Sequence, residues 1–576
     1  MISVPLDYRN VNTLWGSVLA ETLVRCGITR AVISPGSRST PLTMALTRHP
    51  EFESIPVLDE RSAAFFALGL ARQNYQPVVL VCTSGSAGAN YYPAVIEAQE
   101  SGVPLLIITA DRPPELRACA SGQTIDQQQL YGTHVNHFHE LALPDAAPRM
   151  LDYLRQTLAH SCDRTLQPQA GPVHLNVPFR DPLAPMEDPA IVAMQDQLPE
   201  NFFDHLAAAQ SPVWGASKLW MRAISGLGLI VAGPECPPDP AGYAKTVGQL
   251  ATRLGWPILA DGVSPLRYFP AGNAVVVSAY DTILRNAAQA HDLVPRHVIC
   301  LGSWPTSKVL RHWLEQGGAE IVLVSTRIDN RDAMHGRTRQ ICASIETVEV
   351  KVKDKAPDSY ARRWQSAEVG ARTALQGARR PAQPIFEGDI AGTLAVALPE
   401  DTPCFVASSM PIRDVEYFWP PTSRRHRMFF NRGANGIDGT LSTAVGIAHG
   451  NRPAVLLTGD LAFLHDSNGL LLLGKLLGSL TVVLINNAGG GIFEHLPVAQ
   501  FDPPFEEYFA TPQAVDFAQL CQAHGVKHIR VKTLAQLGKL TAKLPVSGIR
   551  VLEVRTNREL DAALRKRLFT QAAATL

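Results

Sequence analysis

The chain has 576 residues, of which 46% are hydrophobic and 18% charged, and its 52 Lys and Arg balance 52 Asp and Glu. This length exceeds what one hydrophobic core usually serves, and the composition is typical of globular rather than disordered proteins. Zero net charge gives no support to nucleic acid or an anionic membrane surface as the main partner. We expect two to four domains, with any basic site confined to a local region.

The cysteines and apolar runs indicate the compartment. Nine cysteines stand singly, without a CxxC pair or a disulfide framework, which favours a reducing environment. The first residues, Met1–Thr13, lack the basic-then-apolar pattern of a signal peptide. The longest apolar run, Leu470–Leu477, is interrupted by Gly474 and Lys475 and falls short of the ~20 residues of a membrane span. We expect a cytoplasmic protein that is not an integral membrane protein.

The first 180 or so residues alternate short apolar runs with helical patterns. Alternation of this kind predicts a parallel sheet covered by helices on both faces. The predicted helices are Thr13–Cys26, Arg61–Arg72 and Ala87–Glu100, and the predicted strands are Ala31–Ser34, Val78–Cys82 and Leu105–Thr109.

Two further α/β regions follow. A Pro-rich stretch precedes strands predicted at Leu227–Val231, Ile258–Ala260, His297–Leu301 and Glu320–Val324. The turn Ala232–Pro238 lacks the G-x-G-x-x-G pattern of a dinucleotide site. After a charged stretch, strands are predicted at Cys404–Ala407, Ala454–Leu457, Thr481–Ile485 and Arg550–Val554. We therefore predict three α/β domains with mainly parallel sheets, at 1–182, 218–354 and 389–576, with linkers at 183–217 and 355–388.

Polar residues follow two of the last predicted strands. Gly459-Asp460 ends one strand, and Asn486-Asn487 ends the next, about one helical crossover later. We expect the Leu-rich segment Leu470–Leu477 to be the buried crossover helix between these two strands. The carboxyl ends of neighbouring parallel strands are where open α/β sheets bind ligands, and Mg²⁺ takes oxygen ligands there, often beside phosphates. The glycines of Ala488–Gly491 allow a backbone carbonyl to approach the ion. Asp460 alone could cap the following helix and the glycines could form a turn, but the combination favours a metal site.

This arrangement is similar to the diphosphate-and-metal motif of thiamine-diphosphate enzymes, a Gly-Asp-Gly followed by Asn-Asn. The resemblance implies that residues 389–576 bind the coenzyme diphosphate and Mg²⁺ (or Mn²⁺), with Asp460, Asn487 and Gly489 as metal ligands. Leu461 departs from the motif's second glycine, which is tolerable if only its backbone N–H faces phosphate.

Glu60 resembles the glutamate with which this family activates its coenzyme by protonating the aminopyrimidine ring. It follows the apolar run Ile55–Leu58 and precedes a small-residue helix, the desolvated place that such a glutamate requires. Asp-Glu-Arg at a helix start is by itself more often a cap with surface ion pairs. The family pattern favours the catalytic role and makes residues 1–182 the pyrimidine-binding domain.

Three segments narrow the resemblance to one family. Ile33–Leu42, Thr109–Leu116 and Asn431–Gly439 resemble the synthases of 2-succinyl-5-enolpyruvyl-6-hydroxy-3-cyclohexene-1-carboxylate, which serve menaquinone and phylloquinone biosynthesis. The resemblance implies decarboxylation of 2-oxoglutarate on the coenzyme. Conjugate addition of the succinyl carbanion equivalent to isochorismate would follow. It also implies a homodimer or homotetramer with active sites at the subunit interface.

The two implied substrates carry several carboxylates, which guanidinium groups bind in bidentate fashion. The matching cations are Arg38, Arg112, Arg413, Arg432 and Lys308, four of them beside Gly, Pro or Ser in apparent loops. The family further implies substrate contacts at Ser37, Gln123, Ser409, Phe493 and Leu496. It implies coenzyme contacts at Ser409, Gly436, Ile437, Gly459, Leu461 and Ile492.

Val309 stands where the family can carry a second cation after Lys308. Arg311 lies three residues beyond Lys308, on nearly the same face of a helix, and we hypothesise that it replaces that cation. The histidines His134, His137 and His139 have spacings unsuited to ligands on one helix face, which favours structural roles.

Two other interpretations stay open. A 2-oxo-acid decarboxylase or an acetohydroxyacid synthase would use the same coenzyme, but such sites need few cations. The second alternative is a catalytically inactive homologue that regulates another protein or binds a dinucleotide. Glu60, Asp460 and Asn487 argue against inactivity, and the missing glycine pattern argues against the dinucleotide.

Overall fold

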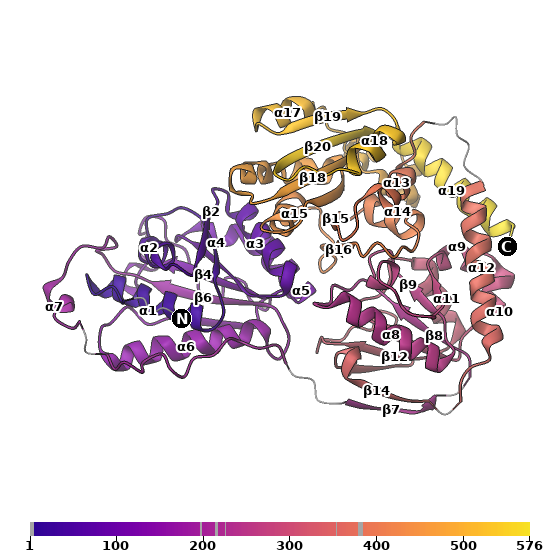
Figure 1. Ribbon diagram of the computed structural model, residues 1–576. Coiled ribbons are helices and arrows are strands. Elements are labelled where there is room, and N and C mark those ends of the chain that lie inside the picture. The colour runs from indigo at the N-terminus through magenta and orange to yellow at the C-terminus, as the bar shows by residue number, and fades with distance from the viewer. Residues whose placement is uncertain (1–4, 196–197, 213–216, 225, 353, 378–383) are drawn as a thin grey trace. The chain divides into compact units, whose positions relative to one another are not determined.

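The computed structural model describes residues 5–195, 198–212, 217–224, 226–352, 354–377 and 384–576. Within these ranges it contains three six-stranded sheets and one two-stranded sheet, and every strand pair is parallel (Figure 1). The chain divides into two compact units. The first comprises Met1–Pro212, Asn431–His449 and Asp466–Leu477, and the second comprises Val213–Phe430, Gly450–His465 and Gly478–Leu576.

The first sheet has the order β2-β1-β3-β4-β6-β5. Its strands are β1 (Arg30–Ile33), β2 (Glu53–Pro56), β3 (Val78–Cys82), β4 (Leu105–Asp111), β5 (His137–Glu140) and β6 (Pro172–Pro178). Its helices are α1 (Val11–Arg25), α2 (Thr40–Arg48), α3 (Glu60–Asn74), α4 (Ser86–Asn90), α5 (Tyr92–Ser101) and α6 (Pro148–Leu166). Strands β3, β4 and β6 are buried along their whole length, as strands covered on both faces must be.

The second sheet has the order β10-β9-β8-β11-β12-β13, the strand order of dinucleotide-binding folds. Its strands are β8 (Gly228–Ala232), β9 (Ile258–Ala260), β10 (Val276–Val277), β11 (His297–Leu301), β12 (Glu320–Ser325) and β13 (Thr338–Cys342). The helices around it are α8 (Pro240–Leu254), α9 (Tyr280–Leu284), α10 (Ala287–Asp292), α11 (Lys308–Gly317) and α12 (Asp358–Gly377), and β7 (Ser217–Ile224) pairs with β14 (Val348–Val352). In a dinucleotide site the turn after β8 would present N–H groups to phosphate. Here that turn carries Glu235, and burial raises the pKa of its carboxyl to about 7.

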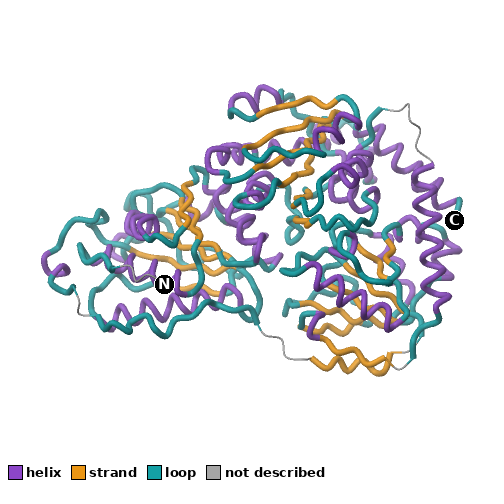
Figure 2. The backbone as a smooth tube through the Cα atoms, in the orientation of Figure 1, coloured by secondary structure: helices purple, strands orange, loops and turns teal. Residues whose placement is uncertain are grey.

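The third sheet has the order β16-β15-β17-β18-β20-β19, which repeats the order of the first. Its strands are β15 (Pro403–Val406), β16 (Arg427–Phe429), β17 (Ala454–Gly459), β18 (Ser479–Asn486), β19 (Lys527–Val531) and β20 (Gly548–Arg555). The helices of this region are α13 (Glu387–Ala397), α14 (Met410–Phe418), α15 (Thr440–Ala448), α16 (Asp460–His465), α17 (Phe517–Ala523), α18 (Leu534–Thr541) and α19 (Arg558–Ala574). Figure 2 shows strands and helices alternating in each of these three regions.

The structure confirms the predicted class of parallel α/β sheets and corrects two details of the sequence interpretation. Leu470–Leu477 is not a buried crossover helix: residues Ser467–Lys475 form a 3-10 helix (η4), and Leu471 and Leu477 are 47% and 60% exposed. The first helix of this crossover, α16, ends at His465 because the Asp466 side chain turns to bind Ser442. In the predicted linker 355–388, α12 buries Tyr360 and Trp364 in the core of the second sheet.

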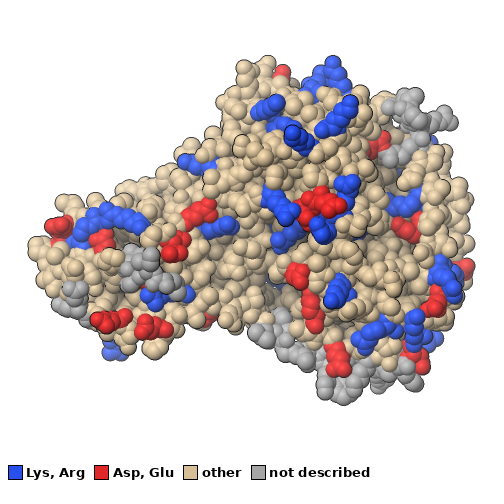
Figure 3. Space-filling view, viewed as in Figure 1, with Lys and Arg blue, Asp and Glu red and all other residues tan. Residues whose placement is uncertain are grey.

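The surface reflects the balanced charge of the chain. On the face drawn in Figure 3, basic and acidic side chains lie in small interspersed groups. Among the described residues, no helix is both long and apolar enough to cross a bilayer.

Candidate active site

Strands β17 and β18 are parallel neighbours, and Asp460 and Asn487 follow their carboxyl ends. Asp460 accepts hydrogen bonds from the backbone N–H groups of Leu461 (2.8 Å) and Gly489 (2.9 Å). Its burial nevertheless raises the pKa of its carboxyl to about 6. Gly489 has φ +136°, and a Cβ there would lie 2.4 Å from the carbonyl oxygen of Ala510, so glycine is required. The predicted metal-binding residues are therefore together.

The amide of Asn487 fits a metal ligand. Its Nδ2 donates to Glu387 at 2.6 Å, whereas Oδ1 is buried without a hydrogen-bond partner among the described residues. A buried carbonyl oxygen without a partner costs roughly 1–3 kcal/mol, and a divalent cation would satisfy it and balance the Asp460 carboxylate. Within the described ranges no three His, Cys, Asp or Glu side chains gather as metal ligands, so an ion here depends on amide and carbonyl oxygens. The residues present fit Mg²⁺ or Mn²⁺.

Strand β15 belongs to the same sheet, the turn after it carries Ser409, and helix α14, which follows, carries Arg413. Ser409 has φ +71°, a conformation that costs a non-glycine residue of order 1–3 kcal/mol and occurs mainly at functional sites. The Arg413 guanidinium donates to the carbonyl oxygen of Ser409 at 2.5 Å. Arg413 lies on α14, whose first turn contains Pro411.

Gly459 ends β17 with open space beside its Cα. The backbone N–H of Leu461, two residues after Gly459, donates to the Asp460 carboxylate. Ile492 and Phe493 are half-buried in the 3-10 helix η5 (Gly491–His495), and Leu496, which follows, is 39% exposed. The three predicted apolar contacts are thus only partly covered.

Glu60 is the first residue of α3 and is half-buried. Asp59, not Glu60, caps the helix by accepting from the N–H of Arg61 at 2.9 Å. Asn90 donates to Glu60 at 3.4 Å, a long contact that leaves the carboxylate accessible to a further partner.

The loop before α15 carries Arg432, Gly436 and Ile437. It is fixed by Glu97, a 3% exposed carboxylate that accepts from the backbone N–H groups of Gly433 (3.1 Å) and Ala434 (2.7 Å). Buried Arg72 binds the same carboxylate at 2.9 Å. Since Arg72 lies on α3, the loop of Ile437 is attached to the helix that begins with Glu60.

Arg38, Arg112 and Gln123 gather in loops that follow the carboxyl ends of β1 and β4. The Arg38 guanidinium is buried, donates to the carbonyl oxygen of Phe179 at 2.9 Å and leaves its Nε without a partner among the described residues. Burial and the positive charge of Arg112 lower the pKa of Arg38. Arg112 donates to the carbonyl oxygen of Gly122 at 3.1 Å, beside exposed Gln123. Two neighbouring cations of this kind favour an anion between them. Ser37 is exposed in the same loop.

A buried polar network that sequence reasoning missed holds these loops. Gln127 accepts from the N–H of Gly85 (2.9 Å) and donates to the carbonyl oxygen of Ala110 (3.2 Å) and to Asn176 (3.0 Å). Asn176 donates to Asp111 at 2.9 Å, next to Arg112. These residues stand on separate elements, so no local spacing in the sequence could have revealed them.

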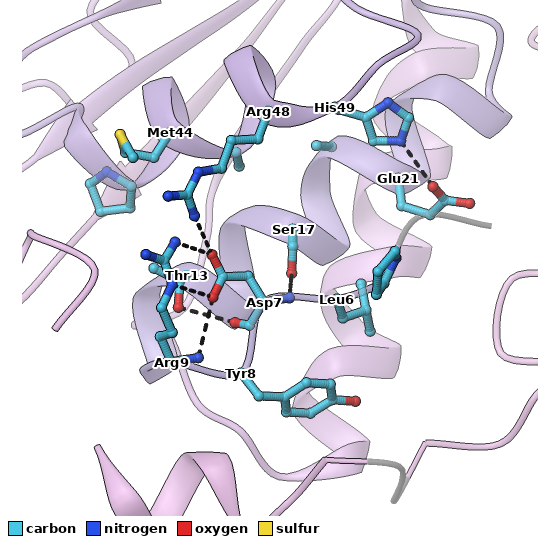
Figure 4. Close-up of a pocket in the computed structure, with 14 residues that line it drawn as sticks. Leu6, Asp7, Tyr8, Arg9, Thr13, Ser17, Glu21, Met44, Arg48 and His49 are labelled. Carbon is cyan, nitrogen blue, oxygen red and sulfur yellow. Dashed lines mark hydrogen bonds and ion pairs between the residues drawn. The ribbon is translucent and has the colours of Figure 1, made fainter. Parts of the chain in front are cut away.

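Helix α2 follows the Ser37–Arg38 loop, and the N-terminal segment anchors its far end. A cavity of about 360 Å³ lies between this segment, α1 and α2 (Figure 4). Asp7 accepts from Arg9 at 2.8 Å and from Arg48 of α2 at 3.0 Å, and His49 contacts Glu21 of α1 at 3.0 Å. The charged groups of this cavity therefore pair with one another, which fixes α2.

Lys308 is the exposed first residue of α11, not a loop residue, because Ser307 caps that helix by accepting from the N–H of Leu310. Val309 packs against the core of the second sheet, a position that would not suit a cation. Arg311 is half-buried, and its Nε is buried without a partner among the described residues. The role of Arg311 stays a prediction.

Comparison with known proteins decides the family. Residues 15–130 match the family described as thiamine pyrophosphate enzyme, N-terminal TPP binding domain, 199–406 match its middle domain, and 414–554 match its C-terminal TPP binding domain. A protein of Synechococcus sp. (strain JA-3-3Ab) named 2-succinyl-5-enolpyruvyl-6-hydroxy-3-cyclohexene-1-carboxylate synthase is 52% identical over 98% of this chain and 97% of its own length. The chain belongs to this synthase family.

Other members and solved structures agree with this assignment. The synthase of Trichodesmium erythraeum (strain IMS101) is 48% identical over 97% of this chain and 98% of its own length. Benzoylformate decarboxylase from Polynucleobacter necessarius shares the fold, with a TM-score of 0.66 over 95% of this chain and 99% of that one at 17% identity. As a member of the synthase family this chain is an enzyme that uses thiamine diphosphate, as predicted.

Proposed function

We propose that this synthase decarboxylates 2-oxoglutarate and adds the remaining succinyl unit to isochorismate. The products are CO₂ and 2-succinyl-5-enolpyruvyl-6-hydroxy-3-cyclohexene-1-carboxylate. The observation that carries the metal and coenzyme site is Asn487 Oδ1, which is buried without a partner among the described residues, two residues before Gly489, whose N–H donates to Asp460. The name of the Synechococcus relative supplies the product.

The third sheet holds the coenzyme diphosphate. Asp460, Asn487 Oδ1 and the carbonyl oxygen of Gly489 bind Mg²⁺ or Mn²⁺, and Gly459 presents its backbone to the phosphates. The N–H of Leu461 reaches a phosphate only by giving up its hydrogen bond to Asp460. When bound, thiamine diphosphate supplies the carbon nucleophile and accepts the charge released as CO₂ departs. Glu60 holds a proton at the aminopyrimidine ring, and Gly436, Ile437, Ser409 and Ile492 contact the coenzyme.

The cations bind the substrate carboxylates. Arg38 and Arg112 support this role because a carboxylate between them would offset the burial and the Arg112 charge that lower the Arg38 pKa. Arg413, Arg432 and Lys308, with Ser37, Gln123 and Ser409, complete the set, and Phe493 and Leu496 form its apolar wall. Pyruvate lacks the second carboxylate of 2-oxoglutarate and should be a poor donor.

We also propose a homodimer or homotetramer in which Glu60 of one subunit acts on the coenzyme held by Asp460 of another. An exposed apolar surface supports an interface beside Glu60: Leu58 is 70% and Leu471 47% exposed. They line a cavity of about 700 Å³ with residues of α2 and η4. Mixing the inactive Glu60→Gln and Asp460→Asn variants under subunit exchange should restore activity. Activity no higher than in either variant alone would contradict this arrangement.

The direct test of the reaction uses purified protein with thiamine diphosphate, Mg²⁺, 2-oxoglutarate and isochorismate. We expect release of CO₂ and consumption of isochorismate, with the product identified by its mass. Neither event occurring would overturn the proposed function. CO₂ release with isochorismate left untouched would instead indicate a 2-oxo-acid decarboxylase.

A further inference from the structure

A buried carboxylate contacts the proposed metal ligand from behind. Glu387 is the first residue of α13 and is 1% exposed. One of its oxygens accepts from Asn487 Nδ2 at 2.6 Å and from the hydroxyl of Thr556 at 3.4 Å, and the other contacts Arg565 at 3.4 Å. Both oxygens of Glu387 therefore have partners, whereas Asn487 Oδ1 has none among the described residues.

This contact determines which way the Asn487 amide faces. Turning the amide over would bring Oδ1 to 2.6 Å from a carboxylate oxygen, and two acceptors at that distance repel each other. With Glu387 in place, Nδ2 faces Glu387 and Oδ1 is presented as a ligand. Without Glu387, both orientations would become accessible, and one of them turns an N–H donor toward the cation.

Arg565 extends the contact to the substrate-binding elements. It lies on α19, is 3% exposed, and donates to Asp414 at 2.5 Å and to His495 at 3.1 Å as well as contacting Glu387. Asp414 is the neighbour of Arg413 on α14. His495 ends η5, between Phe493 and Leu496. One guanidinium thus connects the metal ligand with the predicted carboxylate-binding arginine and the predicted apolar wall.

We propose that Glu387 is a positioning residue that orients Asn487 for the metal ion, and that Arg565 joins it to α14 and η5. The proposal rests on the metal-binding role given to Asn487 under the proposed function. Removing a residue that hydrogen-bonds and orients a metal ligand typically weakens metal affinity by about 10–100-fold. Glu387 and Arg565 themselves touch neither the coenzyme nor a substrate in this account.

The test measures Mn²⁺ affinity by electron paramagnetic resonance in the presence of thiamine diphosphate, without substrates. Glu387→Ala should weaken Mn²⁺ binding by about 10–100-fold. Glu387→Gln retains one acceptor oxygen and should lose less. If the alanine variant does not fold, the glutamine variant decides, provided that its circular dichroism spectrum matches the wild type.

Glu553 provides the matched control. It is 2% exposed and accepts from Asn486, the asparagine before the proposed ligand, at 2.7 Å, while also contacting His528 and Arg555. Glu553→Gln should leave Mn²⁺ affinity unchanged. Equal affinity in wild type and both Glu387 variants, or an equal loss in Glu553→Gln and Glu387→Gln, would overturn the role of Glu387.

A second measurement addresses Arg565. Arg565→Lys keeps the charge but lacks the fork that spans Glu387 and Asp414, so the KM for 2-oxoglutarate should rise with little change in kcat. An unchanged KM together with unchanged Mn²⁺ affinity would remove Arg565 from the proposal. Failure of the metal-binding role itself would look different, because the wild-type protein would then not bind Mn²⁺ with thiamine diphosphate. Failure of the proposed reaction would leave Mn²⁺ binding in place and appear only as a missing product in the assay with both substrates.

Discussion

Replacing Gly446 by alanine tests how the helix of Glu60 is held. Gly446 of α15 faces Gly69 of α3 where the two helices cross, and a Cβ at Gly446 would lie 2.3 Å from the carbonyl oxygen of Phe66 and 2.9 Å from the Cα of Gly69. Both obstacles are backbone atoms, so the helices must separate by roughly 1 Å to restore normal contact.

The magnitude follows from two opposing effects. Overpacking of this kind costs about 1–3 kcal/mol, and the upper end applies because neither backbone can rotate away. Alanine returns about 0.5–1 kcal/mol through its higher helix propensity. The net loss of about 2 kcal/mol should lower the melting temperature of the first unit by ~4–8 °C.

The assay is thermal unfolding followed by circular dichroism for the wild type, Gly446→Ala and a control. Gly474→Ala is the control, because no heavy atom of the described residues, apart from the two chain neighbours, lies within 4 Å of a Cβ there. A Gly446→Ala variant as stable as the wild type, or a control that loses as much, would refute the reasoning.

Three further changes have expected outcomes. Glu60→Gln should lower kcat by about 10²-fold or more while leaving Mn²⁺ affinity unchanged, since the lost function is proton transfer; undiminished kcat would remove Glu60 from that role. Burial raises the pKa of Asp466 from 3.8 to about 7, so the folded protein retains a proton that the unfolded chain has lost, and stability falls as pH rises across this interval. Asp466→Asn should flatten the dependence of the melting temperature on pH between 5 and 7, and an unaltered slope would contradict the assignment. Arg311→Ala should raise the KM of one substrate, and unchanged KM values and kcat would refute its role as the second cation.

The position of the metal site could be predicted because it depends on local order along the chain. Asp460 and Asn487 each directly follow a strand, and neighbouring parallel strands bring their ends together. The repeated strand order of the first and third sheets could not be predicted, because it depends on pairing between distant segments. The same holds for Glu387 and Arg565, which reach Asn487 from separate helices.

Helix boundaries account for most of the differences between prediction and structure. Ser307 beside Lys308 suggests a loop in the sequence, yet Ser307 caps α11, and Pro411 lies in the first turn of α14, the helix that carries Arg413. Both residue types are as typical of helix starts as of loops, so the distinction requires the fold. The leucines of η4 predict a buried helix from the sequence. Their spacing carries no information on the hydrogen bond between Asp466 and Ser442, at which α16 ends.

The reaction itself is tested most directly by following the carbon atoms of 2-oxoglutarate. The purified protein, with thiamine diphosphate and Mg²⁺, is supplied with uniformly ¹³C-labelled 2-oxoglutarate and unlabelled isochorismate, and the products are analysed by mass spectrometry. We expect one molecule of labelled CO₂ to be released for each molecule of isochorismate consumed. All the remaining carbons of 2-oxoglutarate should then be found in the new product. Labelled CO₂ accompanied by a free four-carbon product, or the absence of both, would contradict the proposed reaction.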